Sequence, residues 1–396
     1  MRLLLAVAPI ALLAACGLKG TDNETEADAS ASQSTQSDNL ADSMASNDED
    51  GTAQIPDSEE RPIMQLQVVL DRRGFGPGVI DGEMGISTEN ALEAFQEAND
   101  LDVTGKHDEA TKQALAEWEK IPATRVVTIP AAWGNAEYNA IPDDAAEQAE
   151  MEKLGYETLD ERLAERFHTT VDVLKKLNPG GRPAGSSGGA ESTGSTSTSP
   201  DAEADDSSSA EDEATVSVFR AGQQIRVPNI GGDRIAKGSV DDTDWQSTLM
   251  ALGVGSDQPD VARIVVDESD GWLRGYDEND KLIAAFTVTT GSTNDPLPIG
   301  NWGINGVGHN PTFAYNPELF WDVPDSEEKQ QLPPGPNGPV GVVWIDLTKE
   351  HYGIHGTPEP QTIGRTQSHG CVRLTNWDAA RLAEMVSTST KVVFQS

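Results

Sequence analysis

The chain has 396 residues, and its 28 basic and 66 acidic side chains give a formal net charge of −38 at pH 7. This acidic balance argues against nucleic acid and anionic membrane surfaces as partners, since both are negatively charged themselves. The histidines show no pair at metal-binding spacing, so neither a metal site nor another cofactor is expected. The isolated His107, His168 and His309 are expected to be structural or surface residues.

The chain begins with an apolar segment that ends in one of its two cysteines. Residues 3–13 are all apolar, and Ala14-Ala15-Cys16-Gly17 follows them. This run is too short to span a bilayer and is typical of a secretory signal over residues 1–15. Leu-Ala-Ala-Cys resembles a bacterial lipobox, which implies cleavage before Cys16, a lipid anchor on its sulfur and, from Gly17, the outer membrane. A plain secretory signal is the alternative.

The segment 16–60 is predicted to be a disordered acidic tether. It consists almost entirely of Asp, Glu, Ser, Thr, Ala, Asn and Gln. Little of it can be buried to offset the entropy of the chain, and such a tether would let folded units reach away from a membrane. No later stretch is long and apolar enough to span a bilayer.

Residues 61–120 are predicted to form three helices separated by turns. Apolar side chains from Met64 to Leu70 are spaced as on one helical face, and a glycine-rich stretch follows them. The pattern around Asp81-Gly82 and Ala91-Leu92 is echoed around Gly105 and Ala114-Leu115. This pseudo-repeat resembles the peptidoglycan-binding domain-1 family, which implies a small helical module directed at the cell wall. Asp81-Gly82 is expected to be a turn, and Phe95 a core residue.

Residues 121–230 are predicted to form a strand, two helices and a final strand. The strands are expected at residues 126–129 and 221–228, and the helices at 154–168 and 169–178. This order, with its Leu-Asn-Pro-Gly ending, resembles a LysM glycan-binding module. A low-complexity insertion at 181–215 departs from that pattern and is expected to be disordered. Glycan is therefore an open candidate partner, and a mere spacer is the alternative.

Residues 231–261 are expected to be a linker, and residues 262–395 a mainly β domain. Short β-rich runs are broken by Asp-Gly and Glu-Asn-Asp turns, and a last strand is expected at 392–394. The segment 376–386 is predicted to be a helix capped by Asn376.

The second cysteine, Cys371, lies in this last domain. A lone thiol close to histidines in the sequence is a candidate nucleophile. The thiolate is the reactive form, so a histidine must take its proton and a third group must orient that histidine. His369 would share the face of Cys371 on an extended strand, whereas His355 needs a neighbouring strand to bring it close. The amides of Gly370 and Cys371 could form an oxyanion hole. A half-buried free cysteine beside structural histidines is the alternative.

The sequence His355-Gly356-Thr357, followed by Ser368-His369-Gly370-Cys371-Val372-Arg373, resembles the active-site signature of the L,D-transpeptidase (YkuD-type) family. The stretches 295–300, 310–321 and 333–341 are similar to that family as well, although Leu297 stands where a threonine is usual. The resemblance covers about residues 262–395. It implies a β-sandwich-like YkuD fold with Cys371 near its opening.

The resemblance also implies a catalytic arrangement. Cys371 is the expected nucleophile and His355 the expected general base, oriented by the backbone carbonyl of Gly356. His369 stays open as an alternative base. The implied reaction is attack on the third residue of a peptidoglycan stem, release of D-alanine, and transfer of the acyl group to an amine, which makes a 3–3 cross-link or attaches a protein to the wall.

Four residues of the signature have expected supporting roles. His369 and Gly370 would line the oxyanion side together with the nucleophile, and Ser368 would hold the loop. Arg373 would either bind a substrate carboxylate or lock the loop through an internal ion pair. Two alternatives to transpeptidation remain: an L,D-carboxypeptidase or amide hydrolase on the same scaffold, and a non-catalytic anchor between envelope and wall.

Together these segments predict a multidomain chain. A β-sandwich-like catalytic domain follows a three-helix module and a small βααβ module, with disordered acidic linkers. The expected partners are peptidoglycan stem peptides, glycan, and a membrane through the lipid at Cys16. The expected location is the periplasm of a bacterial cell envelope.

Overall fold

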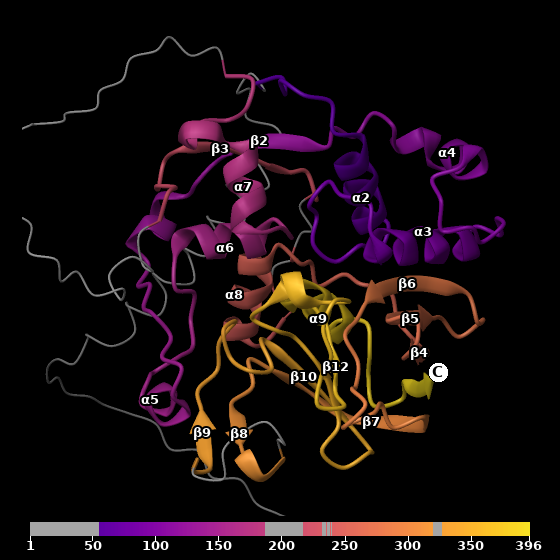
Figure 1. Cartoon of the computed structure of the whole chain (residues 1–396), viewed down its shortest axis with the longest axis vertical. Coiled ribbons are helices and arrows are strands. Elements are labelled where there is room, and N and C mark those ends of the chain that lie inside the picture. Colours follow the sequence, from indigo (N-terminus) through magenta and orange to yellow (C-terminus); the bar gives the residue numbers. More distant parts are fainter. Residues whose placement is uncertain (1–54, 187–216, 232–234, 236–237, 239, 320–326) are drawn as a thin grey trace, which may run out of the picture.

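The computed structural model describes residues 55–186, 217–231, 235, 238, 240–319 and 327–396. The predicted signal, Cys16 and nearly all of the predicted tether lie outside the described residues, as does most of the predicted insertion at 181–215. None of the helices in the described part of the chain is long and apolar enough to cross a bilayer. Figure 1 shows the helical unit and the middle unit side by side above the sheet of the last domain.

The helical unit contains the three expected helices, α2 (Pro62–Arg72), α3 (Ile86–Ala98) and α4 (Glu109–Leu115). Phe95 is 1% exposed and packs edge-on against Phe75, while Gly82 adopts a positive φ in its turn. The short strand β1 (Phe75–Gly76) follows α2 and pairs in parallel with β6 (Leu282–Thr287) of the last domain. The helical unit is therefore joined to the edge of the large sheet by backbone hydrogen bonds.

The middle unit has the expected order of strand, helix, helix and strand. The strands β2 (Thr124–Thr128) and β3 (Gln224–Pro228) pair antiparallel, and the helices are α6 (Leu159–Arg166) and α7 (Val171–Leu177). A further short helix, α5 (Ala145–Ala149), precedes α6. Both main helices are shorter than the sequence pattern suggested, because Thr158 and Thr170 cap their first turns.

The segment expected to be a linker contains helix α8 (Thr243–Leu252). Trp245, Leu249 and Leu252 of this helix are buried in the main hydrophobic core of the last domain. The Trp245 ring stacks on His309 with centroids 4.2 Å apart, and its Nε1 donates to Glu384 at 2.6 Å. The core of the last domain therefore begins before residue 262.

The last domain is mainly β, as predicted. Most of its described strands join β1 of the helical unit in one sheet, in the order β1-β6-β5-β4-β13-β7-β10-β11-β12. The strands not yet placed are β4 (Arg263–Asp267), β5 (Trp272–Tyr276), β7 (Gly300–His309), β10 (Val343–Leu347), β11 (Gly353–His355), β12 (Val372–Arg373) and β13 (Lys391–Gln395). A separate hairpin pairs β8 (Phe313–Tyr315) with β9 (Gln330–Leu332).

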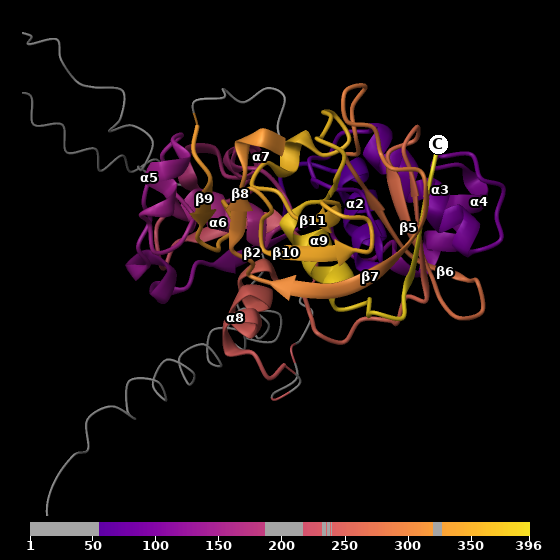
Figure 2. The same cartoon turned by 90° about the horizontal axis from the view of Figure 1, so that it is seen from below.

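The long strand β7 changes partner along its length. Residues 300–303 pair with β13, and residues 304–309 pair with β10. A strand shared in this way joins two half-sheets that can fold over a common core. Figure 2 shows β7 running beneath β10 and β11.

Helix α9 (Asn376–Ala383) packs against the half-sheet that contains β10 and β11. Its cap is Thr375, whose Oγ1 accepts from the Asp378 amide at 3.1 Å; the predicted cap, Asn376, is the first residue inside the helix. The prediction was wrong by one residue because the Asn376 side chain has other partners, described below.

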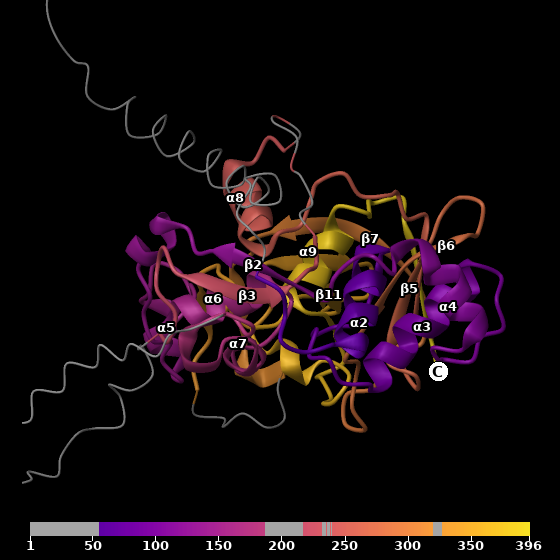
Figure 3. The same cartoon turned by 90° about the horizontal axis from the view of Figure 1, so that it is seen from above.

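The three units meet on helix α9. The His168 ring of the middle unit stacks on Trp377 with centroids 4.9 Å apart and planes 5° apart. Asp71 of the helical unit lies 3.2 Å from Arg381 Nη1 and 3.4 Å from His168 Nδ1. All these side chains are buried, and Figure 3 shows the helical and middle units on the same side of α9. The described units therefore form one packed body.

Candidate active site

Sheet pairing brings the expected catalytic residues to one place. Strand β11 ends at His355, the chain leaves the sheet, and it returns as β12 in parallel beside β11. Ile354 pairs with Val372, so Cys371 lies one position before this pair, next to Gly353. The fifteen residues between His355 and Cys371 thus form a loop that connects two neighbouring strands.

His355 is buried and held in one orientation. Its Nδ1 lies 2.7 Å from the carbonyl oxygen of Gly356. Because a carbonyl oxygen only accepts, Nδ1 carries the ring hydrogen and Nε2 keeps the lone pair that a general base needs. The Trp344 ring stacks on the imidazole with centroids 5.5 Å apart. The Gly356 carbonyl is thus in the orienting position that the sequence suggested.

Burial favours the neutral form of both the thiol and the imidazole. Burial, together with the Arg373 cation, lowers the pKa of His355 to about 3. Burial also raises the pKa of the Cys371 thiol, against the opposing effects of a hydrogen bond from the Gly353 backbone and of Arg373. A neutral imidazole can accept the proton of a thiol that comes within hydrogen-bond reach.

Ser368 stabilises the segment that carries Cys371 and joins it to the backbone of Thr290. Its Oγ donates to the Cys371 carbonyl at 2.6 Å and accepts from the Gly370 amide at 3.2 Å, and its own amide donates to the Thr290 carbonyl at 2.8 Å. The Gly370 amide, expected on the oxyanion side, is therefore engaged inside the loop in this structure. His369 is half-buried between these residues.

Arg373 is fixed through its backbone and acts on the site through its charge. Its amide donates to the Thr289 carbonyl at 2.8 Å, and its carbonyl accepts from the Thr289 amide at 3.0 Å. The guanidinium influences both His355 and Cys371 electrostatically. A fixed cation at this position favours thiolate over thiol and neutral imidazole over imidazolium.

The structure adds neighbours of Cys371 that the sequence reasoning did not single out. The thiol faces the His351 carbonyl at 3.9 Å, and Tyr352 packs against Gly370 so closely that a Cβ there would lie 2.6 Å from the ring. Gly353 lies under the Trp344 ring, where a Cβ would come within 2.5 Å of it. The sequence could have indicated part of this arrangement, because Gly353 and His355 are two positions apart and so share one face of a strand. Trp344, which packs on both, comes from another strand and could not be found from that spacing.

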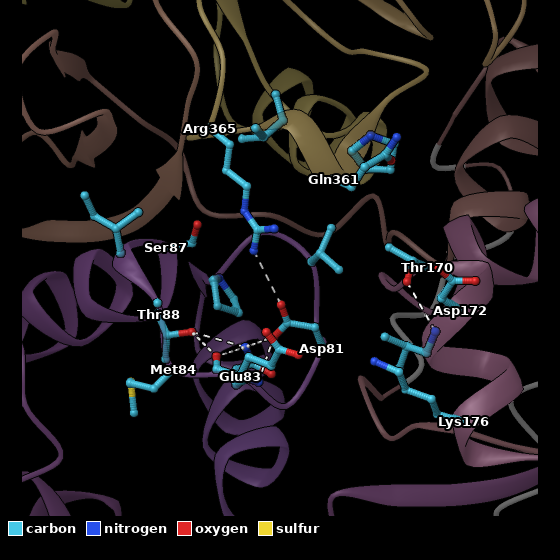
Figure 4. Close-up of a pocket in the computed structure, with 18 of the residues that line it drawn as sticks. Asp81, Glu83, Met84, Ser87, Thr88, Thr170, Asp172, Lys176, Gln361 and Arg365 are labelled. Atoms are coloured by element: carbon cyan, nitrogen blue, oxygen red, sulfur yellow. Dashed lines mark hydrogen bonds and ion pairs between the residues drawn. The ribbon is translucent and has the colours of Figure 1, made fainter.

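A pocket lies beside the loop that joins the base to the nucleophile, and its walls come from all three units (Figure 4). Its volume is about 630 Å³. One wall is the loop 77–88 of the helical unit, another is the start of α7, and the third is residues 360–365. Arg365 reaches across to Asp81, with Nη2 3.7 Å from Oδ2. Within the described ranges, no group of three or more His, Cys, Asp or Glu side chains could hold a metal ion.

Two of the three isolated histidines have structural contacts, and His107 is exposed. His168 and His309 stack on tryptophans, as described above, and burial lowers the pKa of each. His107 is partly desolvated beside Lys112, which also lowers its pKa.

Two family models match this chain. Residues 262–394 match the YkuD family, described as L,D-transpeptidase catalytic domain. Residues 60–115 match the PG_binding_1 family, described as "Putative peptidoglycan binding domain". These matches support a YkuD-type catalytic domain and a peptidoglycan-binding domain at the places where the sequence resemblance put them.

Curated relatives match parts of the chain. "Putative L,D-transpeptidase YkuD" of Bacillus licheniformis is 27% identical over 183 residues, which cover 46% of this chain and 90% of the relative. The protein of the same name in Bacillus subtilis is 49% identical over 57 residues, which cover 14% of this chain and 35% of the relative. "Probable L,D-transpeptidase YbiS" of Escherichia coli is 29% identical over 135 residues, which cover 33% of this chain and 44% of the relative. The last two alignments thus span less than half of each relative.

Solved structures also match, at low overall similarity. An L,D-transpeptidase from Mycobacterium smegmatis is 17% identical with a TM-score of 0.27, over 34% of this chain and 58% of that chain. The NMR structure of the catalytic domain of the E. faecium L,D-transpeptidase is 19% identical with a TM-score of 0.26, over 35% of this chain and 98% of that chain.

Proposed function

We propose that this chain is a peptidoglycan L,D-transpeptidase of the bacterial cell envelope with Cys371 as its nucleophile. The observation that supports the proposal is the pairing of β11 with β12, since β11 carries a buried, oriented imidazole and Cys371 directly precedes β12. The match of residues 262–394 to the L,D-transpeptidase catalytic domain and of residues 60–115 to a peptidoglycan-binding domain supports the choice of substrate.

The proposed reaction passes through a thioester. Nε2 of His355 takes the thiol proton as the Cys371 sulfur bonds to the carbonyl carbon of the third stem residue. The amide bond to the terminal D-alanine then breaks, and His355 returns the proton to the leaving amine. An amine of a second stem then attacks the thioester carbonyl and loses its proton to His355. The C–S bond breaks, the thiolate takes that proton back from His355, and the new amide bond completes the cross-link.

The supporting roles follow from the contacts of each residue. The Cys371 amide, with His369 and Gly370 nearby, lines the side on which the oxyanion develops, and Ser368 holds the loop in shape. Arg373 stabilises the thiolate as it forms. We also propose the lipid anchor at Cys16, which would keep the enzyme at the outer membrane with the wall within reach.

Mass spectrometry of products from purified tetrapeptide muropeptides tests this proposal. Wild type is expected to form dimers that have lost one D-alanine, and Cys371→Ala and His355→Ala to form none. If only shortened monomers form, the enzyme is an L,D-carboxypeptidase and not a transpeptidase. Identical, inert wild-type and Cys371→Ala samples would favour a non-catalytic anchor.

A further inference from the structure

The pocket beside the active-site loop is lined by residues of all three units (Figure 4). Gln67 Nε2 donates to Asp81 Oδ1 at 2.9 Å and to Thr88 Oγ1 at 3.1 Å, and Gln67 Oε1 accepts from the Gly82 amide at 2.8 Å. These bonds fix the wall that belongs to the helical unit. A volume of about 630 Å³ lies within the range of small-molecule sites.

The lining fits a neutral ligand with many hydrogen-bonding groups. Carboxylates and cations both line the pocket, so neither an anion nor a cation is clearly favoured. Between them lies apolar surface, of which Met84 is 45% and Ile86 55% exposed. The charged lining residues are Asp81, Glu83, Asp172, Lys176 and Arg365. Sugar rings with hydroxyl and N-acetyl groups on their edges and C–H groups on their faces have this combination of properties.

We propose that this pocket binds the N-acetylated glycan of peptidoglycan. The proposal rests on the proposed function and makes it more specific, because residues 360–365 belong to the loop between His355 and Cys371. Glycan bound there would contact the loop that leads to the nucleophile. The pocket and Cys371 would therefore engage the same peptidoglycan strand, one by binding its glycan and the other by reacting with its stem peptide.

Isothermal titration of Cys371→Ala protein with chitotetraose, a neutral N-acetylglucosamine oligomer without stem peptides, tests this site. We expect saturable binding that is weakened about tenfold or more when Asp172→Ala and Gln361→Ala are added, as for the loss of two hydrogen bonds. Asp102→Ala, an exposed acid outside the pocket, is the matched control and should bind as before.

Two results would overturn the glycan site: no binding at all, or equal binding with and without the pocket substitutions. Because the titration needs no turnover, it is independent of the proposed reaction. A chain that binds chitotetraose through this pocket but does not process muropeptides would refute the transpeptidase and leave the pocket in place.

A different observation concerns the carbonyl group that orients His355. Gly356 packs against the side chain of Asn376, the first residue of α9, so that a Cβ on Gly356 would overlap Asn376 Oδ1. A Cβ on Gly341 would overlap the same atom. Asn376 Oδ1 also accepts from the Val342 amide at 3.2 Å. One amide group thus supports the two backbone segments next to the base.

The other end of this amide is held by the middle unit. Asn376 Nδ2 donates to Glu165 Oε1 of helix α6 at 2.6 Å and to the Pro336 carbonyl at 3.1 Å. Glu165 is buried, and its Oε2 accepts from the Tyr156 hydroxyl at 2.6 Å. The Leu154 amide donates to the Pro334 carbonyl at 2.9 Å nearby, so the middle unit is bonded to both α9 and the loop before β10.

We infer that Asn376 and Glu165 are positioning residues for His355, through which docking of the middle unit completes the active site. Glu165 fixes the amide of Asn376, and Asn376 fixes Gly356, whose carbonyl sets the imidazole tautomer. Neither side chain needs to touch the substrate. The middle unit then contributes to the chemical step whether or not it binds glycan.

Alkylation of Cys371 by iodoacetamide, followed against pH, tests this coupling without peptidoglycan. We expect Asn376→Ala and Glu165→Ala to slow alkylation at pH 7 about tenfold, toward the rate of His355→Ala, because a misoriented base no longer takes the proton. Glu165→Gln should stay within about twofold of wild type, since an amide keeps the shape and can still accept from Asn376.

Phe95→Leu is the matched control, because it weakens the core of the helical unit without touching the base. Thermal unfolding measures the stability of every variant alongside the alkylation rate. Wild-type alkylation profiles in both alanine variants would overturn the inference. An equal slowing in Phe95→Leu would also overturn it, by reducing the effect to a general loss of stability.

Discussion

At the scale of single residues, the charge of Arg373 and the burial of Cys371 act on the thiol in opposite directions. Burial raises its pKa, and the cation lowers it. In an Arg373→Gln variant only the opposing cation is lost, so the thiolate is less stable and the pKa rises further. We therefore expect the pH midpoint of Cys371 alkylation to move upward in this variant.

The wild-type profile should rise with pH and show no step near pH 6.5, because His355 stays neutral down to about pH 3. Alkylation rates measured by mass spectrometry between pH 5 and pH 10 give both results. A midpoint that moves downward in Arg373→Gln would contradict the electrostatic role of Arg373.

Gly370 is expected to be irreplaceable because of both its backbone and its neighbour. It adopts φ +96°, and a Cβ there would lie 2.6 Å from the Tyr352 ring. Gly370→Ala should therefore displace the nucleophile loop and lower transpeptidation at least about 100-fold, as expected for a nucleophile misplaced by about 1 Å. Gly222→Ala, in the middle unit, is the matched control, with a positive φ of 76° but no atom within 4 Å of the new Cβ.

The control variant should lose only about 1 kcal/mol of unfolding free energy, from backbone strain, and its rate of transpeptidation should stay unchanged. Kinetics and urea unfolding of the two variants separate these effects. Equal activity losses would mean that the contact with Tyr352 has no part in the result.

At the scale of elements, the parallel pairing of β1 with β6 is reinforced by side chains of α3. Arg274 on β5 lies 2.6 Å from Glu97 and 3.6 Å from Glu93, and its guanidinium covers the Trp272 ring at 4.0 Å. We expect Arg274→Ala to lower the free energy of unfolding by about 1–3 kcal/mol, since a largely buried, charge-assisted contact is lost.

Arg263→Ala, on the neighbouring strand β4, provides the comparison. Arg263 also covers an aromatic ring, at 4.2 Å from Tyr276, but its partner Asp280 is 79% exposed. The loss should stay below about 1 kcal/mol, as is usual for surface ion pairs. Urea unfolding of both variants tests the docking contact, and a larger loss in Arg263→Ala would argue against it.

At the scale of the whole molecule, stability depends on the buried charges where the three units meet. Arg381 holds the pKa of the buried Asp71 carboxyl well below its usual range, so Asp71 stays ionised. Arg381→Met would leave this charge without its strongest partner, and we expect a loss of about 3–5 kcal/mol. The loss should affect all three units, because Asp71, His168 and Arg381 come from different ones.

Adding Asp71→Asn to Arg381→Met should recover part of this loss, because the uncompensated charge is then gone. Thermal and urea unfolding of the two single variants and the double variant measure the coupling. Strictly additive losses would show that the two side chains stabilise the molecule independently.

Local pattern in the sequence was sufficient for most of the described helices and strands, and it singled out Cys371 as a candidate nucleophile. Helical spacing from Met64 to Leu70 and the β-rich runs after residue 262 predict their structures, because each depends on neighbours in the chain. Helix α8 was missed, because its short apolar face is buried only when the core of the last domain covers it. The roles of His355 and Cys371 were suggested by residue type and by resemblance to a family.

Only the tertiary structure decided how these parts act together. Thr375 and Asn376 both suit a helix cap, and Thr375 takes that place because the Asn376 amide is bonded to Glu165 of another unit. The low pKa of His355 likewise depends on burial and on Arg373 in the neighbouring strand. The sequence thus determined which groups are available. Contacts between residues far apart in the chain decided their geometry and protonation, because burial and distance do not exist before the chain folds.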